Sequence, residues 1–146
     1  MLSIRPLSPD YAVAPQIDPE DLAAIRAAGY RTVIDNRPDS EIPASHHADR
    51  MRAAAEAAGL AFVPNPVIGG ALTMQNVAAQ AEAMAASDGP VLAYCASGNR
   101  SSIVWSLAQA GKQPVDAILA ATAKAGYQLA HLRPQIEALA AEAKAR

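Results

Sequence analysis

The sequence predicts an α/β fold in which helices cover both faces of a mostly parallel β-sheet. Short apolar runs typical of buried strands alternate with longer stretches of helical apolar spacing, which is the pattern of parallel strands joined by crossover helices. The chain has 146 residues, 51% of them hydrophobic, so it can bury a sizeable core. No repeat and no low-complexity linker divides it. We therefore expect residues 1–146 to form a single domain built as a three-layer sandwich.

The composition argues against several classes of partner. The formal net charge of −2 gives no reason to expect nucleic acid or an acidic membrane surface as a partner. No apolar run approaches the ~18 residues of a membrane span, and the N-terminal stretch lacks the apolar core of a signal peptide. The single cysteine cannot form an internal disulfide, which suits a reducing cytosol. We expect a cytoplasmic protein.

The chain opens with a strand, a helix and a second strand. Residues 11–14 form a short strand that Pro15 ends. Asp18 then caps a helix whose apolar face runs until Gly29. Residues 30–35 are rich in β-branched side chains, which favours a buried strand. The polar loop after this strand lies at its carboxyl end, where open α/β sheets bind ligands.

A further helix and a further strand follow. Ser45 is expected to cap the helix, which runs to Gly59. His46 and His47 are adjacent, so on a helix they point about 100° apart and do not form a chelating pair. We expect no metal site there. Residues 60–64 form the next strand.

Helices dominate the second half of the chain. Thr73 is expected to cap the first of them, and a turn at residues 88–89 leads back into the central strand. Trp105 lies in an apolar helical pattern and is expected to pack in the core. The expected helices of this half are 73–84, 101–111, 114–124 and an amphipathic one from residue 134 onward.

The stretch 91–102 carries the main functional signal. A short apolar run reaches Cys95, crosses a small polar loop and becomes a helical pattern. A strand–loop–helix turn of this kind aims backbone N–H groups at one point above a helix N-terminus, which favours an anion. We expect Cys95 on the rim of an anion-binding nest formed by Ala96, Ser97, Gly98 and Asn99.

Three side chains of this stretch predict nucleophilic chemistry. A helix N-terminus and a nearby cation such as Arg100 can lower the pKa of a cysteine from ~8.5 to about 3.5–7.5, which yields a thiolate at neutral pH. Arg100 also offers a planar fork of donors for an oxyanion, and Ser101 offers a hydroxyl to the nucleophile or the leaving sulfur. A lone cysteine after an apolar strand is most often an inert core residue, but a core cysteine does not need a polar loop behind it.

Three stretches, 12–22, 32–41 and 94–101, resemble the phosphatase-like domain family of beta-lactamase hydrolase-like proteins. Members of that family are described both as tyrosine-phosphatase-like and as sulfurtransferases. The resemblance covers most of residues 5–112 and implies a cysteine-phosphatase-like α/β fold. Several relatives are fused to metallo-hydrolase-like domains, so the resemblance also suggests a separate partner of that type.

The spacing within the cysteine loop favours sulfur transfer. Four residues separate Cys95 from Arg100, as in rhodanese-like sulfurtransferases, whereas phosphatases of the related type have one more. The shorter ring of amides is less able to surround three phosphoryl oxygens. The segment 63–72 also lacks an acid that could protonate a leaving alkoxide, and Asp39 or Glu41 could replace that acid only if the fold brings them across.

We therefore predict a cysteine-dependent sulfurtransferase that needs no metal and no cofactor. Cys95 would attack a small anionic sulfur donor, become a persulfide and pass the outer sulfur to an acceptor thiol. Arg37 could add a second cation, with Asp39 positioning it, although a local salt bridge or turn cap would explain both residues equally well. Two alternatives remain open: a phosphatase with a cysteinyl-phosphate intermediate, and a non-catalytic anion-binding or persulfide-sensing module.

Overall fold

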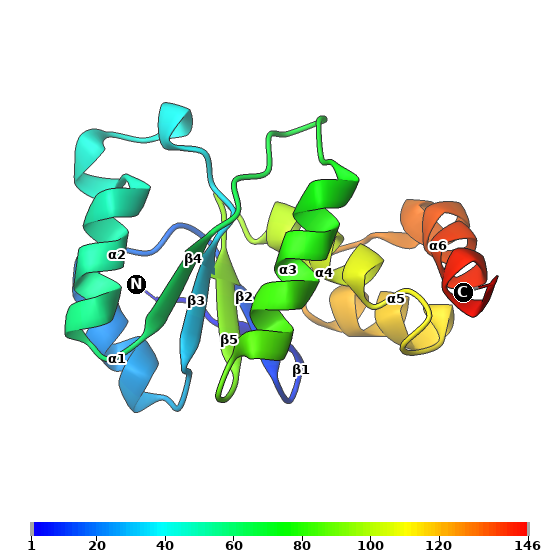
Figure 1. Cartoon of the computed structure of the whole chain (residues 1–146), viewed down its shortest axis with the longest axis horizontal. Coiled ribbons are helices and arrows are strands. Elements are labelled where there is room, and N and C mark those ends of the chain that lie inside the picture. Colours follow the sequence, from blue (N-terminus) through cyan, green and yellow to red (C-terminus); the bar gives the residue numbers. More distant parts are fainter. Residues whose placement is uncertain (1, 146) are drawn as a thin grey trace.

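The structure is a computed structural model that describes residues 2–145. Figure 1 shows a central sheet between two layers of helices, so the predicted three-layer α/β fold is confirmed. The five strands have the order β1-β2-β5-β3-β4. All neighbouring strands are parallel except β1, which pairs antiparallel with β2. The strands are β1 (Arg5–Ser8), β2 (Tyr11–Ala14), β3 (Thr32–Asp35), β4 (Ala61–Pro64) and β5 (Val91–Tyr94).

The helices lie on the two faces of the sheet and enclose two cores. Successive strand residues point to opposite faces, so Leu92 belongs to one core and Ala93 to the other. Trp105 is buried in the second core, as predicted. One face is covered by α1 (Leu22–Ala27) and α2 (Ala48–Ala57). The other face is covered by α3 (Met74–Ala86) and α4 (Asn99–Ala108). Two further helices, α5 (Val115–Lys124) and α6 (Arg133–Ala145), pack against α4 on its outer side.

The start of α2 differs from the prediction. Ser45 does not cap this helix, because it lies in a short 3₁₀ turn, Ala44–His46, that precedes the first helical residue, Ala48. The side chain of Asp39 accepts the hydrogen bond that Ala48 N donates (2.8 Å). An aspartate nine residues upstream therefore takes the role expected of Ser45.

Two other boundaries differ. Strand β1 was not predicted, because its sequence contains Pro6 and a mixture of exposed and buried side chains that is typical of an edge strand. Helix α4 begins at Asn99, two residues earlier than expected, with Gly98 as its N-cap. No helix in the part of the chain that the structure describes is long and apolar enough to cross a membrane. That the whole of residues 1–146 is one domain stays a prediction.

Candidate functional site

The site forms at the carboxyl end of the central strand. Cys95 directly follows β5 and is only 1% exposed. Its Sγ accepts a hydrogen bond from the backbone N–H of Gly98 (3.1 Å). Gly98 has a φ of +93°, a left-handed conformation that a residue with a Cβ rarely adopts, and this turn brings its amide back onto the sulfur. The sulfur therefore contacts the loop that starts α4, as the sequence predicts.

The amides of the loop divide into two kinds. The N–H of Asn99 is already bonded to Ser97 Oγ (3.2 Å), so it is not available to a ligand. The N–H groups of Ala96 and Ser97 donate to no acceptor within residues 2–145. Two unpaired amides at a helix N-terminus are the donors that an anion needs. Of the predicted nest, Gly98 thus holds the sulfur, and Ala96 and Ser97 keep free donors.

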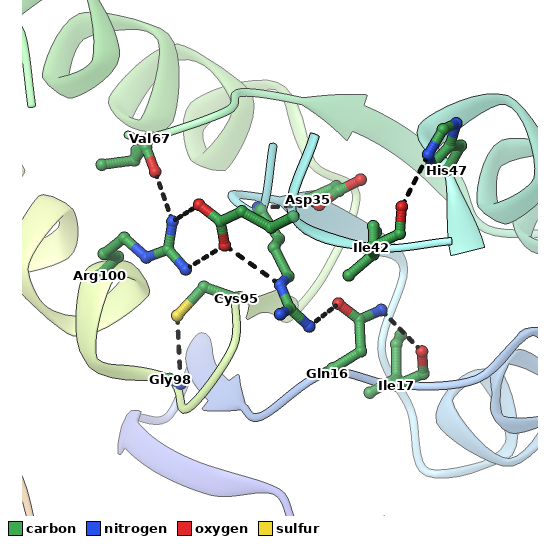
Figure 2. Close-up of polar contacts among 11 residues, drawn as sticks. Gln16, Ile17, Asp35, Ile42, His47, Val67, Cys95, Gly98 and Arg100 are labelled. Carbon is green, nitrogen blue, oxygen red and sulfur yellow. Dashed lines mark hydrogen bonds and ion pairs between the residues drawn. The ribbon is translucent and has the colours of Figure 1, made fainter. Parts of the chain in front are cut away.

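Arg100 is held rigidly above the loop by three hydrogen bonds. Its Nη1 donates to Glu41 Oε2 and to the carbonyl of Val67, and its Nη2 donates to Glu41 Oε1, each at 2.8 Å (Figure 2). The bonds to Glu41 chiefly raise the pKa of the guanidinium, and the nearby Cys95 adds to this effect. A guanidinium has five N–H donors, so Nε and one Nη2 hydrogen remain without a partner among the described residues. These two donors share one edge and can grip an oxyanion bidentately.

Glu41 has a different role from the one considered for it. It was considered only as a replacement general acid, but its carboxylate pairs with Arg100 and also accepts a bond from Arg37 Nε (3.2 Å). These contacts, with the bond from Arg100 first, hold the pKa of Glu41 below its usual value. It is therefore a carboxylate that orients two arginines.

Arg37 is also positioned differently. Its Nη1 donates to Gln16 Oε1 (3.2 Å) and its Nε to Glu41, while Asp39 turns away to cap α2. The structure thus corrects the expectation that Asp39 positions Arg37. Both residues have the local roles, ion pair and cap, that the sequence left open as the alternative.

The hydroxyl of Ser101 bonds to a buried network. Ser101 Oγ donates to Asn36 Oδ1 (2.9 Å), which corrects the expectation that it donates to the nucleophile. Gln80 is fully buried and links Asn36, Asn65 and the hydroxyl of Tyr11. The network was not predicted. Its only signal in the sequence is that Gln80 lies on an otherwise apolar face of its helix. A glutamine that is buried in this way needs hydrogen-bond partners.

Asp35 is the only buried carboxyl near the site in the described part of the chain. Burial is the main cause that raises its pKa from 3.8 to about 6, and the bond that its Oδ1 accepts from Arg37 N (2.9 Å) works against that shift. Figure 2 shows its carboxyl directed away from Cys95. Asp35 is thus not aimed at the thiol.

The histidines bond separately. His46 Nε2 contacts Asp18 Oδ1 (2.7 Å), and His47 Nε2 contacts the carbonyl of Ile42 (2.9 Å). Across residues 2–145 no group of three or more His, Cys, Asp or Glu side chains is arranged to hold a metal ion.

Comparison with known proteins decides the family. Residues 3–112 match the family described as "Beta-lactamase hydrolase-like protein, phosphatase-like domain". The chain belongs to this family. It is 36% identical over 98 residues to the Beta-lactamase hydrolase-like protein of Xylella fastidiosa (strain Temecula1), a match that covers 67% of this chain and 23% of the relative. The phosphatase-like domain therefore spans about a quarter of that longer protein.

Solved structures share the fold. A "putative phosphatase" from Neisseria meningitidis has a TM-score of 0.80 and 29% identity over 93% of this chain and 97% of that one. P. aeruginosa TpbA, as a cysteine-to-serine variant in complex with pTyr, has a TM-score of 0.68 and 16% identity over 95% of this chain and 88% of that one. The phosphatase-like domain is thus a thiol-nucleophile enzyme on a phosphatase-like fold, either a sulfurtransferase or a hydrolase.

Proposed function

We propose that the domain is a sulfurtransferase in which Cys95 carries sulfane sulfur as a persulfide. The observation that carries the proposal is that, among residues 2–145, no acid near the thiol is free to protonate a leaving alkoxide. Glu41 is a carboxylate held by Arg100 and Arg37, and Asp39 caps α2. Asp35 is directed away from Cys95. A reaction whose leaving group needs no proton suits this site best.

Transfer of sulfur from thiosulfate meets that condition. The Cys95 thiolate attacks the outer sulfur, the S–S bond of thiosulfate breaks, and sulfite leaves with the electron pair. An acceptor thiolate or cyanide then attacks the outer sulfur of the persulfide, and the Cys95 thiolate is the leaving group. Neither step needs an oxidant, a reductant or a protonated leaving group.

Each donor of the site has a role in this scheme. The free edge of Arg100, Nε and Nη2, would bind two sulfonate oxygens of the donor, and the free amides of Ala96 and Ser97 would stabilise the persulfide anion. Glu41 fixes the orientation of the Arg100 guanidinium, which lies close enough to Cys95 for the two to interact.

Phosphate-ester hydrolysis is the second candidate, and the comparisons favour it. The family is described as phosphatase-like, and the solved structures of this fold include a complex with pTyr. Cys95 would then form a cysteinyl-phosphate, with water as the second nucleophile. Aryl esters, which have good leaving groups, would be the substrates least affected by a missing acid.

Parallel turnover assays separate the candidates. The protein is incubated with thiosulfate and cyanide while thiocyanate is measured, and with an aryl phosphate while phosphate is measured. Thiocyanate production that Cys95→Ser abolishes supports the proposal. Phosphate release without thiocyanate overturns it in favour of the hydrolase, and no turnover in either assay favours the non-catalytic binding module. A cytoplasmic location and a metallo-hydrolase-type partner stay proposals drawn from the sequence.

A further inference from the structure

A buried amide behind the site has no part in the proposed reaction. Gln80 lies in α3, is fully buried and uses all four of its hydrogen-bonding positions. Its Oε1 accepts bonds from Asn36 Nδ2 (2.9 Å) and Asn65 Nδ2 (2.8 Å). Its Nε2 donates to the Tyr11 hydroxyl (2.9 Å) and to Asn36 Oδ1 (3.1 Å). The side chain is therefore bonded to three segments of the chain that are far apart in the sequence.

Two of these partners lead to the acceptor of Arg100. The carbonyl of Val67 accepts a bond from Arg100 Nη1 (2.8 Å; Figure 2). Val67 N donates to the carbonyl of Asn36 (2.9 Å), and Asn36 Nδ2 donates to the carbonyl of Asn65 (2.9 Å). Gln80 holds the side chains of both asparagines. It therefore fixes the loop that presents the Val67 carbonyl.

The remaining contacts lead to the backbone that carries Arg100. Ser101 follows Arg100 in the first turn of α4 and is bonded twice. Its carbonyl accepts a bond from the Tyr11 hydroxyl (2.9 Å), and its Oγ donates to Asn36 Oδ1 (2.9 Å). Both partners are bonded to Gln80. Gln80 is thus linked to Arg100 at both ends, through the helix backbone and through an acceptor of the guanidinium.

Stability alone does not require this network. Apolar side chains of similar volume often stabilise a core as well as a satisfied polar network does, because each buried amide must be desolvated first. A fully satisfied network adds a single defined geometry, since amide groups bond in fixed directions. Such a geometry is what a binding group needs, because the two-donor edge of Arg100 can grip an oxyanion only when its orientation is fixed.

We propose that Gln80 is a positioning residue that fixes the Arg100 guanidinium for oxyanion binding. It acts through the Val67 carbonyl and the first turn of α4, whereas Glu41 holds the same guanidinium directly. The inference rests on the proposed function only in that Arg100 binds an oxyanion, which a hydrolase of this fold would also need. Sulfate is therefore the probe, because neither reaction consumes it.

Protection of Cys95 by sulfate measures this role without turnover. The rate at which iodoacetamide alkylates Cys95 is followed at increasing sulfate concentration and constant ionic strength, which gives the concentration that halves the rate. Gln80→Met keeps the length of the side chain but loses its four bonds. We expect it to raise the half-protecting concentration about fivefold, the effect of one ordinary hydrogen bond. Absence of protection in the wild type, or an unchanged concentration in Gln80→Met, would overturn the proposal.

Val77→Ala is the matched control for a general loss of stability. Val77 lies one turn before Gln80 in α3 and is buried in the apolar core. Its truncation leaves a cavity and destabilises the fold, but it removes no hydrogen bond of the network. We expect its half-protecting sulfate concentration to equal that of the wild type. A rise as large as that in Gln80→Met would mean that stability, not positioning, sets the affinity for sulfate.

A double-mutant cycle assigns the effect to Arg100. In an Arg100→Lys background the ammonium has no planar edge to orient, so adding Gln80→Met should change the half-protecting concentration less than twofold. A fivefold change in both backgrounds would show that Gln80 acts on another part of the site, and would contradict the proposal.

NMR keeps the proposal falsifiable if Gln80→Met does not fold. Tyr11→Phe removes only the hydroxyl that links Gln80 to Ser101. In the ¹⁵N-labelled protein, the Arg100 Nε–H signal is identified by its absence from Arg100→Lys. Its heteronuclear NOE should be high in the wild type and in Val77→Ala, and lower in Tyr11→Phe. A wild-type NOE in Tyr11→Phe would overturn the proposal. Failure of sulfur transfer would leave these outcomes intact, because none depends on turnover.

Discussion

At the scale of single residues, Gly98 is constrained twice. Its φ of +93° strains any residue that has a Cβ, and a Cβ built there would overlap the Tyr127 hydroxyl. Gly70 has a similar φ of +78°, but a Cβ there meets nothing within 4 Å. We expect Gly98→Ala to lower the free energy of unfolding by about 3 kcal/mol and Gly70→Ala by about 1 kcal/mol, as measured by urea denaturation. Equal costs would show that the Tyr127 contact is unimportant.

Glu41 is the residue whose role the structure changes most. Glu41→Gln keeps the shape but loses the charge-assisted pair with Arg100, so the oxyanion-binding edge loses its orientation. We expect a loss of roughly 10- to 100-fold in kcat/KM for thiosulfate, mostly through KM, corresponding to about 1.5–3 kcal/mol. Glu56→Gln, which breaks a looser pair with Arg52 at 4.0 Å, should have no such effect. An unchanged or lower KM in Glu41→Gln would show that Glu41 does not position Arg100.

The sequence predicted the nearest neighbours of Cys95 better than the distant ones. Cys95, Gly98 and Arg100 lie within six residues of one another, so local spacing was enough to bring them together. Glu41 and Arg100 are 59 residues apart, and only the parallel pairing of β3 with β5 brings them together. A single sequence carries no signal for such a pair.

At the scale of elements, the segment after α5 secures the cysteine loop. Tyr127 donates a hydrogen bond to the carbonyl of Ser97 (2.9 Å), and Arg5 lies over the Tyr127 ring at 5.5 Å. Residue 127 lies outside the matched region 3–112. The contact therefore links the C-terminal helices of this chain to the loop that holds the sulfur.

Removing this contact should loosen the loop and leave the fold in place. We expect Tyr127→Phe to cost about 1 kcal/mol in unfolding free energy and to slow sulfur transfer severalfold. Tyr30→Phe is the matched control, because Tyr30 is half-buried and precedes β3 at the end of the sheet opposite the loop. If Tyr127→Phe slows transfer no more than Tyr30→Phe does, the segment plays no part in holding the loop.

Elements with a regular apolar pattern were predictable, and elements fixed by long-range contacts were not. Strands β2 to β5 and the helix capped by Thr73 follow from local pattern and capping chemistry. Strand β1 is defined by its pairing with β2, and the start of α2 by a bond from Ala48 to Asp39. Neither contact leaves a trace in the spacing of apolar residues.

At the scale of the whole molecule, Asp35 should make stability depend on pH. Burial raises its pKa from 3.8 to about 6, so the folded state keeps a proton that the unfolded chain has already released. The free energy of unfolding therefore falls as the pH rises through this window and stays lower above it. From pH 5 to pH 7.5 we expect a loss of about 1–1.5 kcal/mol from this group.

Urea denaturation at the two pH values checks this expectation. Asp35→Asn keeps an acceptor for Arg37 N but cannot ionise, so it should lose this part of the pH dependence and be more stable than the wild type at pH 7.5. Asp88→Asn should behave like the wild type. The same pH dependence in Asp35→Asn would mean that other groups cause it.

The most direct test of the sulfurtransferase account is the mass of the Cys95 peptide after the protein meets thiosulfate. We predict that one sulfur atom is added at Cys95, that cyanide removes it, and that Arg100→Lys lowers its yield because a lysine cannot present the two-donor edge. A peptide that gains no sulfur, or that gains one which cyanide cannot remove, would contradict the account.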